Sequence, residues 1–202
     1  MNHFDAIMAT KRSARLVLFV GIMALMASTL EGCAGLAIGG AATTVGLVND
    51  RRTTGTLIED QAIELKARRA LHEQKELNSQ THISVTSYNT VVLVSGEAPT
   101  EEMRNLVIDT VRNVEKVRHV YDEVSIAGPS SLLSRSADSL VTAKVKTRIL
   151  TIKDFNGMRV KVVTENGVVY LMGLLDKEES DIVANAARKV GGVQKVVKLF
   201  EH

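Results

Sequence analysis

The sequence predicts an α+β fold in which one helix–strand–strand–helix–strand unit occurs twice, behind a membrane-targeting segment. Three observations indicate this: a stretch that recurs at a fixed offset, alternating helical and strand periodicities in each copy, and an uncharged N-terminal stretch that ends at the only cysteine. Hydrophobic residues make up 45% of the 202 residues and charged residues 24%, which is typical of a globular protein rather than a disordered one.

The internal repeat is the strongest indication of the fold. Residues 85–96 (VTSYNTVVLVSG) align with residues 162–173 (VVTENGVVYLMG) and are identical at five of twelve positions. A V-x-x-V-x-x-V pattern follows in both copies, at 114–120 and 190–196, after one residue of slip. Self-similarity of this kind indicates one supersecondary unit that is used twice.

Each copy is predicted to begin with a helix, near residues 60–75 and near 138–151. Apolar residues at a spacing of four define the buried stripe of each helix: Ile63, Ala67 and Leu71, then Val141, Val145 and Ile149. A second helix should begin at paired acids, Glu101-Glu102 and Glu178-Glu179, because the helix dipole favours negative charge there.

The strands of each copy are predicted around a tight hairpin turn. Alternating residues indicate first strands at 83–85 and 160–162, and the turn residues are Asn89-Thr90 and Asn166-Gly167. Return strands are expected at 91–95 and 168–172, ending at Gly96 and Gly173, with last strands at 117–126 and 193–200. Val92 and Val169 should be equivalent buried positions. Each unit should consist of two helices on a small three-stranded mixed sheet. Because so small a domain buries only part of its surface and is marginally stable alone, the two units should pack together.

The N-terminus has the pattern of a secretion signal. Three basic residues precede residues 16–30 (LVLFVGIMALMASTL), a stretch without charge that suits a signal peptide and is too short to span a bilayer. The segment Leu30-Glu31-Gly32-Cys33 resembles a bacterial lipobox, although Glu31 departs from the usual small or neutral residue. We therefore predict cleavage before Cys33 and lipidation of its thiol; the alternative is a signal anchor that is never cleaved.

The repeated V-x-V…N-[GT]-V-V-x-[LV]-x-G…V-x-x-V-x-x-V pattern resembles the BON domain. With the lipobox and a short tether, nearly all of residues 30–200 resemble dual-BON outer-membrane lipoproteins linked to cell division and envelope stress. The predicted organisation is a signal peptide (1–32), a lipidated tether (33–58), BON domain 1 (59–127), a linker (128–137) and BON domain 2 (138–202). Ala34, rather than Asp, after the cysteine is typical of lipoproteins sorted to the outer membrane. The uncharged residues 34–48 are read as a flexible tether, with a second membrane-inserted segment as the alternative.

Several classes of function are disfavoured by the composition. Aromatic residues make up 3%, tryptophan is absent and the net charge is +2, so nucleic acid is not an expected partner. No hydrolase, zinc-protease or P-loop motif occurs, and no pair of the five histidines has metal-ligand spacing. We therefore predict no enzyme activity, no catalytic residue, no metal site and no cofactor.

The helix near 138–151 carries the candidate binding residues. Beside its buried stripe lies a face with one apolar residue, two cations and two hydroxyls and no acid: Leu140, Lys144, Thr147, Arg148 and Thr151. Such a face can place an apolar side chain among acyl chains while its cations meet phosphates. An ordinary solvated face is the alternative. The BON resemblance implies that this helix binds anionic phospholipid, although Leu140 stands where an aromatic residue is expected, which would weaken the interaction. The corresponding first-domain helix mixes acids and bases and should bind anionic lipid poorly.

The leading hypothesis is a lipid-anchored protein on the periplasmic face of the outer membrane that binds anionic phospholipid and supports outer-membrane integrity. The second hypothesis is a protein-interaction adaptor at the outer-membrane assembly machinery or the division site.

Overall fold

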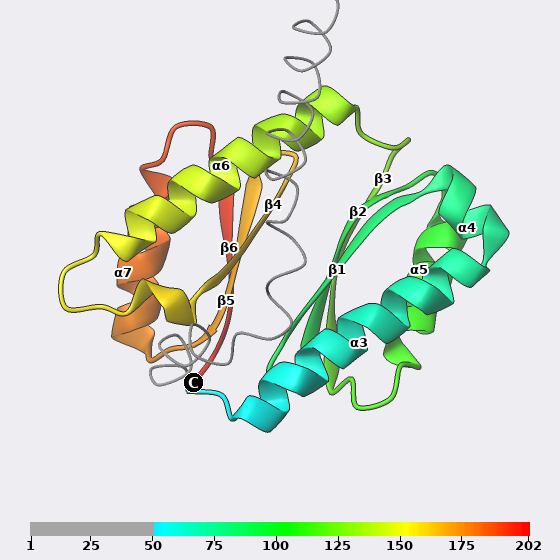
Figure 1. Cartoon of the computed structure of the whole chain (residues 1–202). Helices are drawn as coiled ribbons and strands as arrows, with labels where there is room; N and C mark the ends of the chain where they lie inside the picture. The colour runs from blue at the N-terminus through cyan, green and yellow to red at the C-terminus, as the bar shows by residue number, and fades with distance from the viewer. Residues whose placement is uncertain (1–50) are drawn as a thin grey trace, which may run out of the picture. The chain divides into compact units, whose positions relative to one another are not determined.

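The computed structural model describes residues 51–202 (Figure 1). The predicted signal peptide, Cys33 and the tether as far as residue 50 lie outside the described residues. Among residues 51–202, no helix combines the length and the apolar character that crossing a bilayer requires.

The predicted α+β fold with a repeated αββαβ unit is confirmed. The first copy consists of α3 (Thr54–Glu73), a short α4 (Lys75–Gln80), β1 (His82–Tyr88), β2 (Val91–Ala98), α5 (Glu101–Arg112) and β3 (His119–Ile126). The second consists of α6 (Leu132–Leu150), a 3₁₀ turn (Gly157–Arg159), β4 (Lys161–Glu165), β5 (Val168–Leu174), α7 (Lys177–Arg188) and β6 (Lys195–Glu201). In both sheets the middle strand pairs antiparallel with the first strand and parallel with the last, so both sheets are mixed.

The first helix of each copy is longer than the apolar spacing predicts. Helix α6 begins at Leu132 rather than near 138, and α3 begins at Thr54 rather than near 60. Hydroxyl caps set these starts, because Ser131 Oγ accepts a hydrogen bond from Ser134 N and Thr53 Oγ1 accepts one from Thr56 N. The added first turns bury no apolar residue, so the periodicity did not reveal them.

Both hairpin turns are the predicted two-residue turns. Asn89, Thr90, Asn166 and Gly167 all have positive φ, as the turn that matches strand twist requires. A buried aspartate from the preceding helix holds each turn: Asp138 accepts from the backbone N–H groups of residues 166 and 167, and Asp60 from those of 89 and 90, at 2.8–2.9 Å. The role of these two aspartates was not predicted from the sequence.

The expectation that Gly96 and Gly173 end the return strands is wrong. Gly96 lies inside β2, which continues to Ala98, and Gly173 lies inside β5. Gly96 has φ +121°, and a Cβ there would lie 1.9 Å from the backbone oxygen of His82. The glycine therefore permits close approach of the neighbouring strand instead of terminating its own.

Each helix pair covers one face of its own sheet, and the opposite faces of the two sheets meet. Val92 and Val169 are both 0% exposed within their cores, as predicted. A third cluster joins the two copies through residues of both sheets: Tyr88, Val91, Leu93, Tyr170, Met172 and Leu199. The expected packing of one unit on the other is therefore confirmed.

Candidate functional site

The outer face of α6 is exposed as its periodicity predicts. Val141, Val145 and Ile149 are buried in the second core. On the neighbouring face Leu140 is 63% exposed. The four polar candidates are exposed as well: Lys144, Thr147, Arg148 and Thr151. The fold thus presents all five predicted residues to the surroundings of the protein.

The cations of this face are available to a ligand. Within residues 51–202, neither Lys144 nor Arg148 nor the adjacent Lys146 forms an ion pair with a carboxylate. The only acid in α6 is Asp138, which is buried and holds the hairpin turn. This helix therefore carries uncompensated positive charge.

The hydroxyls of the face are engaged differently from the cations. Thr147 Oγ1 donates to the backbone oxygen of Ala143 at 3.0 Å, and Thr151 Oγ1 donates to that of Arg148 at 2.8 Å. Both hydroxyl protons are thus used inside the helix. Their oxygens can still accept a hydrogen bond, but the threonines are not free donors for a phosphate.

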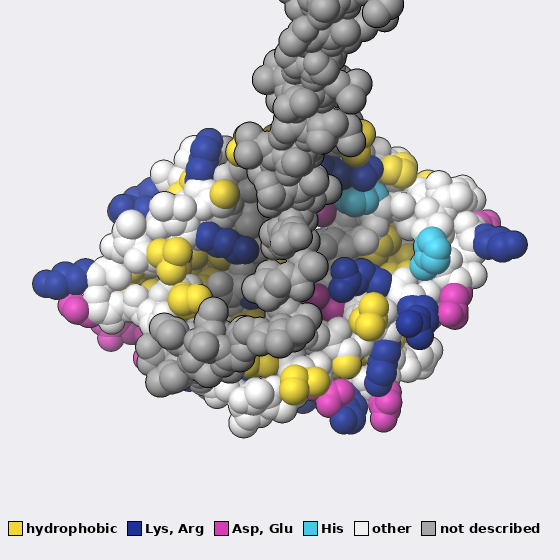
Figure 2. All heavy atoms as spheres, in the orientation of Figure 1, with side chains coloured by type: hydrophobic (Ala, Val, Ile, Leu, Met, Phe, Trp, Pro, Cys, Tyr) yellow, Lys and Arg dark blue, Asp and Glu magenta, His cyan; other side chains and the backbone are white. Residues whose placement is uncertain are grey.

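Further apolar residues extend the face. Leu133 is 81% exposed and, two helical turns before Leu140, lies on the same side of α6. Leu132, Leu150 and Met158 are exposed as well. Hydrophobic and basic side chains are neighbours over α6 in Figure 2. Leu132 and Leu133 fall within the predicted linker (128–137), so their place on the helix was not predicted.

Most charges of the corresponding helix α3 have ion-pair partners, although Arg69 forms no ion pair among the described residues. Lys66 Nζ lies 3.0 Å from Glu115, and Glu59 lies 2.7 Å from Lys116 Nζ. The hydrogen bond from Lys66 lowers the pKa of Glu115. Arg68 lies 3.8 Å from Glu64 in the predicted i,i+4 pair. Helix α3 therefore offers little net charge to an anionic surface.

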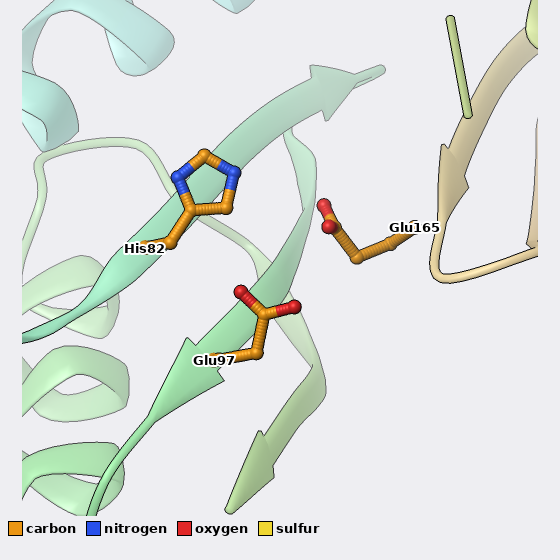
Figure 3. A group of neighbouring side chains, drawn as sticks. All are labelled: His82, Glu97 and Glu165. Atoms are coloured by element: carbon orange, nitrogen blue, oxygen red, sulfur yellow. The ribbon is translucent and has the colours of Figure 1, made fainter. Parts of the chain in front are cut away.

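A second cluster lies between the two copies, where His82 of β1, Glu97 of β2 and Glu165 of β4 point toward one another (Figure 3). One ligand atom from each lies within 4.8 Å of the other two. Burial, followed by the nearby charges of Glu97 and Asp138, raises the pKa of Glu165 to about 7. Burial, followed by the charge of Arg135, lowers the pKa of His82.

No pattern in the sequence reveals this cluster. Its members come from three strands and two copies, so they show no ligand spacing along the chain. The only local indication is that His82 pairs with Glu97 across the first hairpin. This pairing can be recognised only when the exact strand register is known.

Comparison with known proteins identifies the repeated unit. A family model described as the BON domain matches residues 59–128 and again residues 137–201. The chain belongs to the BON family. It carries two BON domains, and the fold described above is the one that the resemblance implied.

Three relatives resemble the chain over most of their own length. The outer membrane lipoprotein DolP of Haemophilus influenzae is 32% identical over 86% of this chain and 90% of its own. The 21 kDa hemolysin of Actinobacillus pleuropneumoniae is 32% identical over 76% of this chain and 79% of its own. The osmotically-inducible protein Y of Escherichia coli is 30% identical over 70% of this chain and 72% of its own. None of these names describes a catalysed reaction. The chain is thus a DolP-like protein with two BON domains.

Proposed function

We propose that the protein is a lipid-anchored outer-membrane protein that faces the periplasm, binds anionic phospholipid through α6 of BON domain 2 and thereby supports outer-membrane integrity. The observation that carries this proposal is the exposed face of α6, where Lys144 and Arg148 stand without acidic partners beside Leu140. Lys144 and Arg148 would meet lipid phosphates, Leu140 would enter the acyl boundary, and Thr147 and Thr151 would line the contact.

The free energy of membrane binding would be the sum of small electrostatic and hydrophobic contributions. A Lys or Arg near an anionic leaflet contributes about 1 kcal/mol, and each buried methylene contributes about 0.8 kcal/mol. The face of α6 supplies both terms, because Leu133 lies along the same side as Leu140. On α3 the cations Lys66 and Arg68 are paired with acids, which weakens the electrostatic term that this helix can supply.

The proposed anchor complements this weak contact. Acylation of Cys33 would hold the protein at the membrane, so α6 would need to select the lipid rather than supply all of the affinity. The similarity to an outer membrane lipoprotein over 86% of the chain supports this location. The division into signal peptide, tether, two domains and linker predicted from the sequence is part of the proposal.

Vesicle flotation tests the lipid contact. Residues 51–202 lack the anchor, so any flotation would report the two BON domains alone. We expect flotation with vesicles that contain phosphatidylglycerol and not with phosphatidylcholine vesicles, and a decrease at high salt. Equal behaviour with both vesicle types would contradict the proposal.

A protein-interaction adaptor is the second candidate function. The observation that favours it is the pair of exposed leucines, Leu132 and Leu133, at the start of α6, since an apolar surface also suits a protein partner. Failure to float with anionic vesicles would favour this role.

A further inference from the structure

We propose that His82, Glu97 and Glu165 bind one divalent transition-metal ion, Zn²⁺ by its ligand chemistry, between the two BON domains. The site involves no residue of the α6 face and does not depend on lipid binding. One imidazole nitrogen and two carboxylates are donors that Zn²⁺ accepts, with water in the fourth position.

The three donors are nearly in place. Their ligand atoms lie within 4.8 Å of one another, whereas the ligand atoms of a tetrahedral Zn²⁺ site lie about 3.4 Å apart, given metal–ligand distances near 2.1 Å. Among the described residues, no hydrogen bond holds the imidazole of His82 or the carboxylate of Glu165. Rotation of these two side chains can therefore close the remaining gap.

Glu97 is the fixed member of the cluster. Its side chain is 2% exposed, and it accepts hydrogen bonds from Asn166 Nδ2 at 2.6 Å and from the backbone N–H of Ser130 at 3.2 Å. Ligating carboxylates in metal sites are typically oriented by such outer bonds. Because Asn166 directly follows Glu165, the same bond brings the carboxylates of both domains together.

The backbone places the histidine opposite Glu97. His82 and Glu97 are direct partners in the antiparallel pairing of β1 with β2, so their side chains share one face of the sheet. The neighbouring Gly96 permits the close approach of β1 at His82, where any Cβ would collide with the backbone. Two of the three ligands are thus set by the register of a single hairpin.

The local charge favours a divalent cation. Three carboxylates act here, from Glu97, Glu165 and the nearby Asp138, against the single guanidinium of Arg135. Metal binding requires both glutamate ligands to be ionised, and with Asp138 and Arg135 these groups then sum to −2, which one divalent ion balances. Arg68 also lines the space beside His82 and lies 3.8 Å from Glu64, a carboxylate that Lys161 approaches at 3.6 Å as well.

A cavity of about 360 Å³ gives access to the site. Its walls include His82 of the first domain and Glu165 of the second, with Arg135 and Thr142. A water molecule occupies about 30 Å³ in the liquid, so the space admits a hydrated ion and retains water at the free coordination position.

The internal repeat supplies a comparison within the same molecule. At the repeat offset of 77 residues, His82, Glu97 and Glu165 correspond to Arg159, Leu174 and Tyr88. There the tyrosine hydroxyl donates to the backbone oxygen of Arg159 at 3.0 Å, and no carboxylate or imidazole stands at any of the three positions. The repeated fold therefore does not require metal-ligand side chains at these positions. Only His82, Glu97 and Glu165 carry them, and their repeat equivalents do not.

Zinc titration of the full chain in detergent micelles, stripped with EDTA and dialysed, tests the site. Isothermal calorimetry should detect one Zn²⁺ per chain and much weaker binding of Mg²⁺, which prefers oxygen ligands. His82→Ala and Glu165→Gln should each weaken Zn²⁺ binding by about tenfold or more. His72→Ala is the matched control, since His72 is an exposed histidine bonded to Asn78 away from the cluster, and should bind as the wild type does.

Thermal unfolding gives a second reading that does not depend on calorimetry. Zn²⁺ should raise the Tm of the wild type and of His72→Ala, because an ion held by both domains binds only the folded chain. Glu165→Gln, which preserves the shape of the side chain, should lose this rise while keeping its circular dichroism spectrum. The proposal is overturned if the wild type binds no Zn²⁺, if Mg²⁺ binds as tightly, or if neither cluster variant weakens binding.

Discussion

Reversal of the two candidate lipid-binding cations on α6 is the sharpest test of the charge asymmetry between the domains. The double variant Lys144→Glu/Arg148→Glu exchanges two cations for two anions on a face that contains no other acid. Both residues are exposed and neither forms an ion pair within residues 51–202, so the buried stripe beneath them should remain packed. Folding stability should change by less than about 0.5 kcal/mol, as for most surface substitutions.

The expected loss of lipid affinity follows from the number of charges. Each near-surface cation contributes about 1 kcal/mol toward an anionic membrane, so loss of two costs about 2 kcal/mol and added repulsion raises this to as much as about 4 kcal/mol. Since about 1.4 kcal/mol is a factor of ten, binding to phosphatidylglycerol vesicles should weaken roughly 30- to 700-fold at low salt. The difference should shrink at high salt, because screening removes the attraction in the wild type.

The matched control reverses two cations of the first domain. Lys66 and Arg68 are paired with Glu115 and Glu64, so Lys66→Glu/Arg68→Glu removes charge that α3 does not offer to a membrane. Vesicle flotation of residues 51–202 should show much less loss of binding for this variant. Unchanged binding of the α6 variant with its fold intact, or equal losses in both variants, would refute the assignment of the lipid contact to α6.

Three other predictions concern the core, the half-buried carboxylate of Glu165 and the anchor. Val92→Ala and Val169→Ala should each lower the free energy of unfolding by about 1–3 kcal/mol in urea denaturation, because both side chains are fully buried; a negligible change would contradict closed packing there. In the presence of EDTA, the free energy of unfolding of the wild type should fall as pH rises from 4.5, the ordinary pKa of Glu165, to about 7, its pKa in the folded state, because the folded state binds more protons than the unfolded state over this range. Glu165→Gln should remove this slope and be more stable than the wild type at pH 8 by about 1–2 kcal/mol after allowance for solvent screening. Identical pH profiles of the two proteins would show that the carboxyl is not desolvated. Cys33→Ser should abolish incorporation of labelled palmitate and leave the chain uncleaved or mislocalised, whereas retained label would exclude Cys33 as the acylation site.

The sequence by itself determined the repeated unit and the inner faces of its elements. The Asn-Gly turn, the alternation around Val169 and the spacing of Val141, Val145 and Ile149 are local patterns, and the structure reproduces each of them. Burial of one side of a helix or strand repeats at the period of that element, so it is written into neighbouring residues. The outer face of α6 followed from the same periodicity, including the exposure of Leu140.

Only the tertiary structure decided which charged groups have partners. Lys66 and Glu115, and the members of the His82 cluster, are far apart in sequence and meet through strand register and domain packing. Gly96 shows the same limit, since its role depends on how closely β1 approaches and not on its neighbours in the chain. A pairwise charge interaction depends on distance in space, and no periodicity along one element encodes the position of a side chain from another.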